Sequence, residues 1–593
     1  MRGIPGHLRS QRFMLVAVCL AVCSSSGAPS AHDAAAKTTA IADAYVKGYF
    51  EAFPEQALQG GAPDIYPDRL TDHSLAALGR WQTREDQWLA ELRAIDGTVL
   101  AGAPEAATYA LLQNLLESAQ VFRICRMELW NVSPTFTGWQ SELSITAGMQ
   151  ATSTPEQQRQ ALARWAQLPA YLDAEIANLR TGVKLGYLAP KGNVRSVIAQ
   201  VDAMLRAPVA ESPFVQMAKG DAKPFRMALE ELETAKIRPA IARYRDYLRD
   251  EYLPSAREAI GISANPRGAE GYRAAVMYHA TVDLTAQGIH DLGLAQMKAI
   301  RAQMAEIGQR SFGTADPAQV LAVMRNDPKY RFKSRKELIQ YAEAAVERAR
   351  LALPRFFGRL PKAPVIVEPY PALLEKSAPG GQAILPTADG QPGKYLINAR
   401  NATEQSRAGL ESTAFHETYP GHHLQGTLAL EREGLHAISR YFWLSGYGEG
   451  WALYAERLAE EMGLFSSDVD RLGMLSNEAM RAARLVVDPG MHVLGWSRQQ
   501  AIDYLVAHTT ETKAGAEAEI DRYIAAPGHA TAYMIGSLEI WKLRTEAEQA
   551  LGAKFDLRAF HDALLEDGGL PLWALRAKID RWVAVRRPTT TQK

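Results

Sequence analysis

The chain has few cysteines and no excess of charge of either sign. Its 593 residues include three cysteines, and two of them, Cys19 and Cys23, lie in an apolar segment near the N-terminus. Cys125 is left without a partner for an internal disulfide, so a large apolar core must stabilise the fold. Basic residues and acidic residues both number 66. This balance gives no support to a nucleic-acid-binding protein, which usually carries a basic excess.

Long hydrophobic runs are also missing. The one prominent apolar run, residues 13–23 (FMLVAVCLAVC), is too short to span a membrane as a helix; it follows three arginines and precedes small residues ending at Ala28. This pattern predicts a signal peptide over residues 1–28, export to the periplasm or secretion, and no stable membrane insertion after its removal. Two alternatives stay open: an uncleaved anchor, and lipidation of Cys23, although Val22 is larger than the residue normally found before a lipidated cysteine.

Helical periodicity dominates residues 33–360. Apolar residues recur at three- and four-residue spacing in stretches such as 75–92, 105–129 and 155–185. The run from Thr154 to Gln157 is typical of a helix start, with proline just inside the helix. We therefore predict a mainly α fold in which residues 33–360 form a helical N-terminal region and one wall of a cleft.

The pattern changes to short β-like runs between residues 363 and 399. The runs PVIVEPY (364–370), GQAILPT (381–387) and KYLIN (394–398) are separated by glycine- and proline-rich turns. They predict a small antiparallel sheet that either offers an edge to an extended peptide or only stabilises the fold. Residues 361–593 are predicted to form the catalytic region, with this sheet, metal-binding helices over 411–460 and further C-terminal helices.

A possible metal site begins at His416, in the sequence HETYPGHH. A histidine followed by glutamate and then by another histidine is typical of zinc hydrolases, in which the glutamate acts as a general base. Here the spacing differs from HExxH, because His422 is six residues after His416 and an unbroken helix would direct the two side chains apart. His423 would return to the same face, but about 10 Å further along the axis. We expect Pro420 and Gly421 to break the helix and bring His422 beside His416.

The third ligand is predicted in the run GYGEGWALYAERL. Glu449 lies at the start of an otherwise apolar helix, where a buried carboxylate is costly unless it is paired or bound to metal. Glu456 is the alternative ligand, although we prefer it as an acceptor for the imidazole of a metal-binding histidine. A further possibility is that Glu449 only interacts with the helix dipole.

Further candidates come from polar residues in the apolar C-terminal helices. Tyr533 and His492 are candidate donors to the oxyanion that forms on an attacked carbonyl. Arg544 and Arg484 are candidates for holding a substrate carboxylate in a bidentate manner. For each of them, a hydrogen bond within the core is an equally acceptable interpretation.

Several of these motifs together resemble one family. HETYPGHHLQ, GEGWALYAERL, VDPGMHVLGWS and PGHATAYMIGSLEIWKLR are similar to the bacterial domain-of-unknown-function 885 family, and the resemblance covers nearly all of the mature chain. It implies a large multi-helix, zincin-like metallopeptidase fold without a settled substrate. GEGWA also resembles the NEGFA stretch of zinc aminopeptidases, whose glutamate is a zinc ligand, which favours Glu449 over Glu456. The family pattern has Gln at the position of His529 and Lys at that of Met534, so the role of position 529 is open.

The combined prediction is an exported zinc-dependent metallohydrolase, most simply an exopeptidase or oligopeptidase for short peptides. One zinc ion would be held by His416, His422 and Glu449, and Glu417 would pass a proton from water to the leaving amine. The alternatives are a metal-dependent hydrolase of a non-peptide amide or ester and a non-catalytic metal-containing binding protein. Mn, Co or Fe would also suit these ligands.

Overall fold

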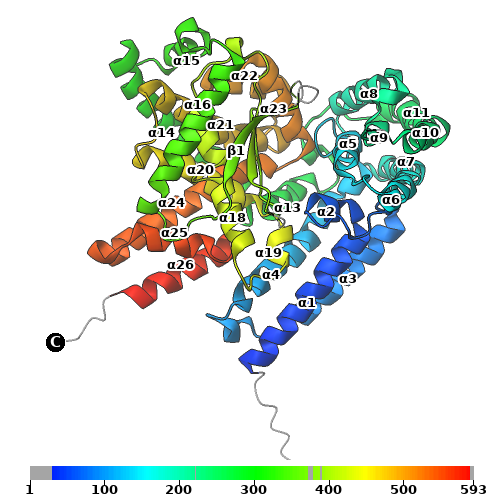
Figure 1. Ribbon diagram of the computed structural model, residues 1–593, viewed down its shortest axis with the longest axis horizontal. Coiled ribbons are helices and arrows are strands. Elements are labelled where there is room, and N and C mark those ends of the chain that lie inside the picture. Colours follow the sequence, from blue (N-terminus) through cyan, green and yellow to red (C-terminus); the bar gives the residue numbers. More distant parts are fainter. Residues whose placement is uncertain (1–29, 221, 372–374, 376–377, 388–389, 588–593) are drawn as a thin grey trace, which may run out of the picture.

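The chain is mainly helical, as predicted, and it forms a main body and a smaller lobe at its side (Figure 1). The computed structural model describes residues 30–220, 222–371, 375, 378–387 and 390–587. The predicted signal peptide, residues 1–28, lies outside this part of the chain. Among the described helices, none combines the length and apolarity needed to cross a membrane.

The main body contains helices from both ends of the chain. The first four are α1 (Ala31–Ala52), α2 (Pro54–Gln59), α3 (Leu75–Arg93) and α4 (Glu105–Phe122). Those that precede the sheet are α13 (Gly268–Ala280), α14 (Ala286–Phe312), α15 (Pro317–Asn326) and α16 (Arg335–Ala352). Those that follow it are α17 (Leu410–Glu417), α18 (His422–Glu431), α19 (Ile438–Tyr441), α20 (Ser445–Glu461), α21 (Asp468–His492), α22 (Arg498–His508), α23 (Lys513–Ala525), α24 (Ala532–Leu551), α25 (Leu557–Leu565) and α26 (Leu572–Arg586).

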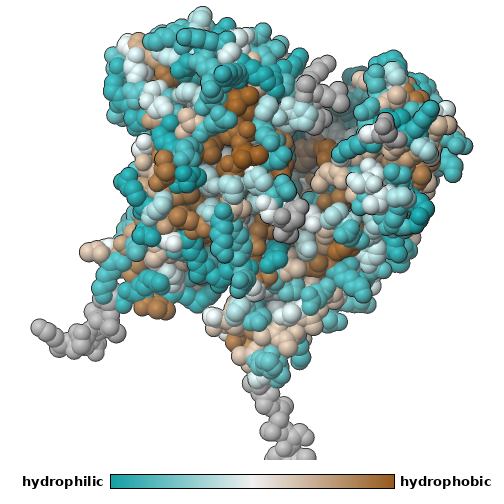
Figure 2. Space-filling model, viewed as in Figure 1, coloured by the Kyte–Doolittle hydropathy of each residue, from teal (hydrophilic) through white to brown (hydrophobic). Residues whose placement is uncertain are grey.

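The lobe is formed by consecutive helices between α4 and α13. They are α5 (Trp139–Met149), α6 (Pro155–Trp165), α7 (Leu168–Leu185), α8 (Lys191–Arg206), α9 (Pro213–Gln216), α10 (Lys223–Leu232), α11 (Arg238–Tyr247) and α12 (Leu253–Ser255). Helix α6 begins at Pro155, as the sequence predicts, and the side chains of Thr154 and Gln157 form a capping box in which each bonds the other's backbone N–H. Figure 2 shows that the visible face is hollowed between the lobe and the main body, with hydrophobic residues on both sides.

Buried apolar side chains form two separate cores. The larger core joins α1, α3 and α4 with helices from α13 to α26, so residues on both sides of position 360 pack together. The smaller core lies in the lobe and consists of residues 132–256 with Leu70. Each large apolar side chain that becomes buried contributes about 1.5–3 kcal/mol to folding. The predicted division at residue 360 therefore does not coincide with a division between cores.

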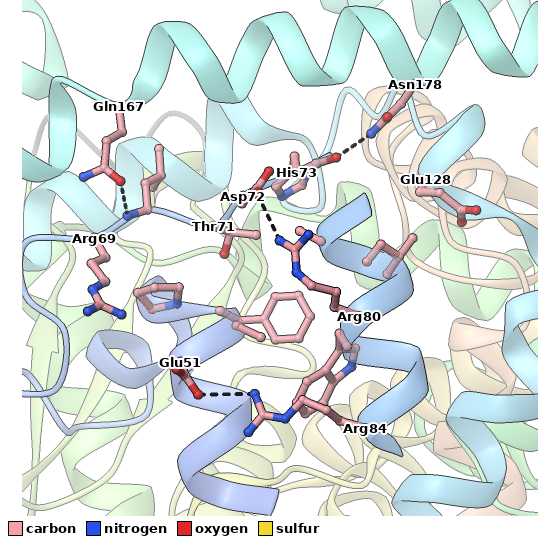
Figure 3. A pocket seen from close by; sticks show the side chains of 17 residues that line it. Glu51, Arg69, Thr71, Asp72, His73, Arg80, Arg84, Glu128, Gln167 and Asn178 are labelled. Carbon is pink, nitrogen blue, oxygen red and sulfur yellow. Dashed lines mark hydrogen bonds and ion pairs between the residues drawn. The ribbon is translucent and has the colours of Figure 1, made fainter. Parts of the chain in front are cut away.

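Polar contacts fasten the lobe to the loop before α3. The Leu70 N–H donates to Gln167 Oε1 at 3.4 Å, and Asn178 Nδ2 donates to the His73 carbonyl oxygen at 2.7 Å (Figure 3). His73 Nδ1 also lies 2.5 Å from Glu175 Oε1. A cavity of about 390 Å³ opens beside these contacts, and none of the described residues that line it is a predicted site residue.

A partly buried glutamate at this junction makes stability depend on pH. Glu142 of α5 accepts a hydrogen bond from Gln56 Nε2 of α2 at 2.9 Å. Burial, followed by the negative charge of Glu55, raises the pKa of Glu142 from its ordinary 4.5 to about 7. Between these pH values the folded protein keeps a proton that the unfolded chain has released. This carboxyl therefore favours folding in acid, and its contribution is lost as the pH rises from 4.5 to 7.

Glu142→Gln is expected to stabilise the protein at pH 8 by about 1–3 kcal/mol and to change little at pH 4.5. The amide carries no charge to bury and keeps an oxygen for Gln56. Thermal unfolding at both pH values would measure the effect, with Glu91→Gln, an exposed glutamate of α3, as the control. An equal change at both pH values would contradict the prediction.

The small sheet has three strands, at the predicted positions. They are β1 (Val365–Pro369), β2 (Gly381–Ile384) and β3 (Gly393–Ile397), in the order β1-β3-β2. The predicted antiparallel arrangement is wrong for one pair, because β1 pairs with β3 in parallel, whereas β2 pairs with β3 antiparallel. The connection after β1 carries the chain to the opposite side of β3, so β1 and β2 form the two edges. The outer edge of β2 has no strand partner among the described residues.

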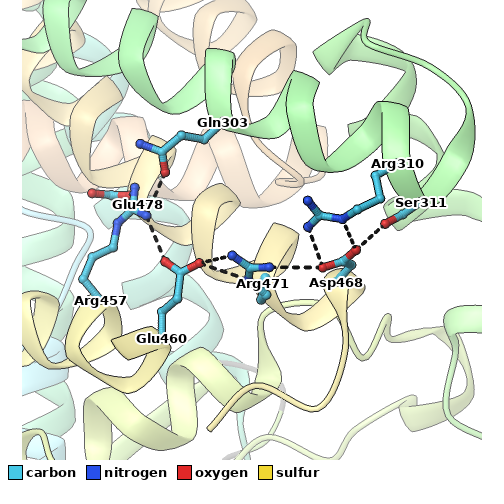
Figure 4. Close-up of polar contacts among 8 residues, drawn as sticks. All are labelled: Gln303, Arg310, Ser311, Arg457, Glu460, Asp468, Arg471 and Glu478. Atoms are coloured by element: carbon cyan, nitrogen blue, oxygen red, sulfur yellow. Dashed lines mark hydrogen bonds and ion pairs between the residues drawn. The ribbon is translucent and has the colours of Figure 1, made fainter. Parts of the chain in front are cut away.

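Charged residues tie α20 to the helices behind it. Arg457 and Glu460 of α20 lie 3.3 Å apart, and Arg471 of α21 donates to Glu460 at 2.6 Å (Figure 4). Asp468 of α21 accepts from Arg310 of α14 at 2.8 Å. This network joins α14, α20 and α21 and holds in place the helix that carries Glu449 and Glu456.

Candidate metal centre

Three predicted ligands lie together at the meeting point of α17, α18 and α20. The Nε2 atoms of His416 and His422 are each 3.5 Å from Glu449 Oε2, and the two imidazole rings are 4.7 Å apart. One nitrogen or oxygen atom from each residue lies within 4.8 Å of the others. This is a spacing that a single metal ion can bridge.

Pro420 and Gly421 interrupt the helix between the two histidines, as the spacing predicts. A Cβ atom at position 421 would lie 1.9 Å from the His416 carbonyl oxygen, so the fold-back requires glycine for steric reasons. Trp451 Nε1 donates to the Pro420 carbonyl oxygen at 2.9 Å and holds the break against α20. His422 therefore lies beside His416 instead of on another side of a continuous helix.

Glu456 lies behind His416, away from the other two ligands. Its Oε1 is 2.8 Å from His416 Nδ1, and Ser412 donates to its other oxygen. Arg481 Nη2 lies 3.6 Å from Oε1, and Glu456 itself is buried. A carboxylate in this position orients the imidazole so that Nε2 faces the ligand cluster. This is the position preferred for Glu456 on the basis of the sequence.

Carboxylates dominate the electrostatics of the cluster. Burial lowers the pKa of His416, but hydrogen bonds to Glu449 and Glu456 outweigh burial and raise this pKa to about 9. Burial raises the pKa of Glu449, but its bonds with His416 and His422 keep it well below its usual range. The excess of negative charge suits a cation, and a metal ion that binds there would displace the proton from His416.

Glu417 lies at the free edge of the sheet. Its Oε2 accepts a hydrogen bond from the backbone N–H of Ala383 in β2 at 2.8 Å. Glu417 is partly exposed and, in the part of the chain that the structure describes, it forms no ion pair. A carboxylate next to a predicted ligand histidine and free of a cationic partner can accept a proton.

His423 points away from the ligand cluster. Its Nε2 lies 3.0 Å from the Ala363 carbonyl oxygen, and its Nδ1 lies 3.4 Å from Thr427 Oγ1. A Cβ atom at Gly393 of β3 would lie 2.5 Å from His423 Nδ1, so glycine makes room for the ring. His423 therefore packs α18 against the sheet and does not replace His422.

Tyr533 lies near Glu449 because α20 and α24 pack closely against each other, with glycines at their contact. A Cβ atom at Gly450 would lie 2.6 Å from the Gly536 backbone, and one at Gly536 would lie 1.8 Å from the Gly446 carbonyl oxygen. Burial, with the charge of Glu449, raises the pKa of Tyr533 to about 12, so its hydroxyl keeps its proton at neutral pH. That hydroxyl makes no hydrogen bond with any residue that the structure describes, and it can donate to an oxyanion.

Arg484 packs against the ring of Tyr533. Its guanidinium carbon lies 4.4 Å from the Tyr533 ring centroid, a cation–π contact. Its Nε donates to the Tyr523 hydroxyl at 2.8 Å, its Nη2 lies 3.1 Å from Glu519, and its Nη1 is buried. Contrary to the prediction, Arg484 is not available to hold a substrate carboxylate, because its nitrogen atoms are enclosed.

The structure removes two other candidates from the site. His492 is fully buried, with its Nε2 3.0 Å from the Tyr523 carbonyl oxygen and its Nδ1 accepting from the Ile262 N–H at 3.2 Å. Both of its ring nitrogens are used, so the predicted oxyanion role of His492 is wrong. Arg544 bonds Glu548 and Glu461, both at 2.8 Å, and its predicted role in substrate binding is wrong for the same reason.

His529, whose role the sequence left open, lies beside Tyr533. Their ring centroids are 5.9 Å apart, and His529 Nδ1 is 3.3 Å from Arg522 Nη1. Burial and the charge of Arg522 lower the pKa of His529 to about 4, so the ring is neutral at pH 7. Sequence reasoning also missed Trp443, whose ring lies 5.4 Å from that of His422. Its position just before the GYGEGWA run was the available signal.

The family described as bacterial protein of unknown function (DUF885) matches residues 54–579. The structure of a protein described as "putative lipoprotein" from Colwellia psychrerythraea is 25% identical, with 94% of this chain and 100% of that chain covered and a TM-score of 0.82. A second structure, of a "putative lipoprotein of unknown function" from Shewanella oneidensis, is 19% identical, with 91% and 99% covered and a TM-score of 0.71. No curated protein matches the chain. Because the family match spans most of the sequence, this chain belongs to the DUF885 family.

Proposed function

We propose that this protein is an exported, zinc-dependent peptidase that cleaves short peptides. The observation that carries the proposal is the convergence of His416, His422 and Glu449, with Glu417 directly after the first of them. Two imidazoles and one carboxylate suit zinc, and Glu456 orients His416 in the way that is usual for zinc-binding histidines. When bound, zinc would act as a Lewis acid and lower the pKa of a water molecule.

Residues of the protein carry out the proton transfer and stabilise the negative charge that develops on the substrate. Glu417 accepts a proton from the attacking water and passes it to the leaving amine. The Ala383 N–H holds the Glu417 carboxylate at 2.8 Å and limits its rotation. Tyr533 donates its hydroxyl proton in a hydrogen bond to the carbonyl oxygen as negative charge develops there. Arg484, stacked against the Tyr533 ring at 4.4 Å, fixes the orientation of that ring.

The free edge of β2 favours a peptide over a compact amide or ester. The Ala383 N–H lies on this edge and faces Glu417, so the edge runs beside the proposed base. An extended peptide can add to such an edge through backbone hydrogen bonds. The hollow between the lobe and the main body favours short peptides over folded proteins.

Export is part of the proposal. The apolar run at residues 13–23 provides a signal for secretion. Both structural relatives are described as putative lipoproteins, which supports export and also lipidation at Cys23 as the alternative to cleavage near Ala28.

Incubation with a mixed peptide library, with and without a metal chelator, tests the proposed function. We expect cleavage of short peptides that is lost with the chelator and restored by zinc. The cleavage positions, read by mass spectrometry, distinguish an exopeptidase from an oligopeptidase. Turnover of amides or esters with intact peptides would favour the non-peptide hydrolase, and metal binding without any turnover would favour a binding protein.

A further inference from the structure

Two large aromatic side chains beside the site are unusually exposed. Trp443 is 56% exposed and Phe136 is 50% exposed, and among the described aromatic side chains only Tyr278 and Trp573 are also exposed. The Trp443 ring lies 5.4 Å from that of His422. The Phe136 ring lies 6.2 Å from that of His529, which is 5.9 Å from the ring of Tyr533. The Trp443 ring therefore adjoins a proposed metal ligand, and the Phe136 ring is connected to the proposed oxyanion donor through His529.

The backbone of α20 fixes Trp443 in its exposed position. A Cβ atom at Gly448 would lie 2.1 Å from the Trp443 ring, so the indole packs directly on the helix backbone. Gly448 precedes Glu449, which places the indole next to the ligand cluster. The exposed indole is therefore held in place by its packing against α20.

Phe136 is presented by an ordered turn of the lobe. Ser133 Oγ lies 2.9 Å from Thr135 Oγ1, and Thr137 Oγ1 donates to Ser133 Oγ at 2.8 Å. Gln140 Nε2 donates to the Ser133 carbonyl oxygen at 2.8 Å and anchors the turn to α5. The side chain of Phe136 therefore reaches from the lobe towards His529 of the main body.

We infer that Trp443 and Phe136 determine specificity by contacting large apolar side chains of the peptide substrate. The inference rests on the proposed function and adds the substrate class. Trp443 lies beside His422, which is 3.5 Å from Glu449, and Phe136 lies beside His529, which contacts Tyr533. In the proposed reaction, the amide that is cleaved would lie between these two groups. An extended peptide advances about 3.3 Å per residue, so residues near the cleaved bond can reach both rings. Because each ring comes from a different body, the substrate bridges the main body and the lobe.

Binding to an inactive protein tests the inference without relying on turnover. The full chain carrying Glu417→Gln, loaded with zinc, would be titrated with two fluorescently labelled hexapeptides, one with two central phenylalanines and one of alanine only. We expect Trp443→Ala and Phe136→Ala each to weaken binding of the phenylalanine peptide by about tenfold or more and that of the alanine peptide by less than about threefold. Trp443→Leu, which keeps an apolar surface, should retain part of the preference.

Trp573→Ala, at an exposed tryptophan of α26, is the matched control and should change neither affinity. Unchanged binding of the phenylalanine peptide in the Trp443 and Phe136 variants would overturn the inference and leave the proposed function intact. Equal weakening of both peptides would also overturn it. If neither peptide binds to the zinc-loaded parent protein, the proposed function fails, and this inference fails with it.

Discussion

Replacing Glu417 by glutamine is expected to reduce peptide hydrolysis by about 10²–10⁴-fold while zinc binding is retained. Glutamine has nearly the same shape, and its amide oxygen can still accept the hydrogen bond from the Ala383 N–H. It cannot take a proton from water at neutral pH. Glu417 forms no ion pair with His416, His422 or Glu449. The arrangement of these three residues should therefore persist in the Glu417→Gln variant. The loss should therefore appear in kcat, with little change in peptide affinity.

Steady-state kinetics on a peptide identified from the library, together with the metal content of the purified protein, would measure both effects. Glu368→Gln is a suitable control, because Glu368 lies on β1, at the opposite edge of the sheet, and pairs with Lys394 at the surface. Its activity should match that of the parent protein. Turnover retained by Glu417→Gln would refute the assignment of the base, and loss of zinc from this variant would point to a ligand role instead.

The convergence of His416, His422 and Glu449 could be predicted from the sequence because it depends on local chemistry. Six residues separate His416 from His422, and only a break in the helix can bring such side chains to one ion. Pro420 and Gly421 supply that break, and the structure adds the steric reason for glycine at 421. Glu449 was identifiable because a carboxylate in an apolar helix needs a partner.

The other candidates failed because a buried polar side chain looks the same in sequence whether it faces a site or a neighbouring backbone. His492 bonds a carbonyl oxygen and an amide, and Arg544 bonds two glutamates, yet both lie in apolar helices like Tyr533. Only the glycine contacts between α20 and α24 distinguish Tyr533, and these are contacts between distant segments. Phe136 lies in another lobe, 280 positions before His416, so no local pattern could relate the two.

The order of the strands could not be predicted from local sequence patterns either. The three β-like runs were recognisable, but strand order depends on where the connection after β1 passes. This matters for function, because the order β1-β3-β2 leaves β2 at the edge and places its Ala383 N–H against Glu417. The two roles weighed for the sheet, stabilising the fold and offering an edge to a peptide, are therefore compatible, because β3 stabilises the edge strand β2 that faces Glu417.

Replacing Glu449 by alanine should produce the largest loss of metal affinity among the acidic residues of α20. The carboxylate supplies one of the three ligand atoms that lie within 4.8 Å of one another, and no other described acidic residue occupies this group. Glu456→Gln keeps all three ligands and removes only the charged acceptor of His416, for which about 10–100-fold weaker binding is expected. For Glu449→Ala we expect a loss above that range.

Competition with a chromophoric chelator would measure zinc affinity, and thermal unfolding with and without zinc would provide an independent measure. A metal ion present at a thousand times its Kd stabilises the folded protein by about 4 kcal/mol, and Glu449→Ala should lose this gain. Glu461→Gln is the matched control, because Glu461 lies on the same helix and pairs with Arg544 away from the cluster. If Glu456→Gln lost more affinity than Glu449→Ala, the two carboxylates would have to exchange roles, since a residue behind His416 acts only by orienting a ligand that remains.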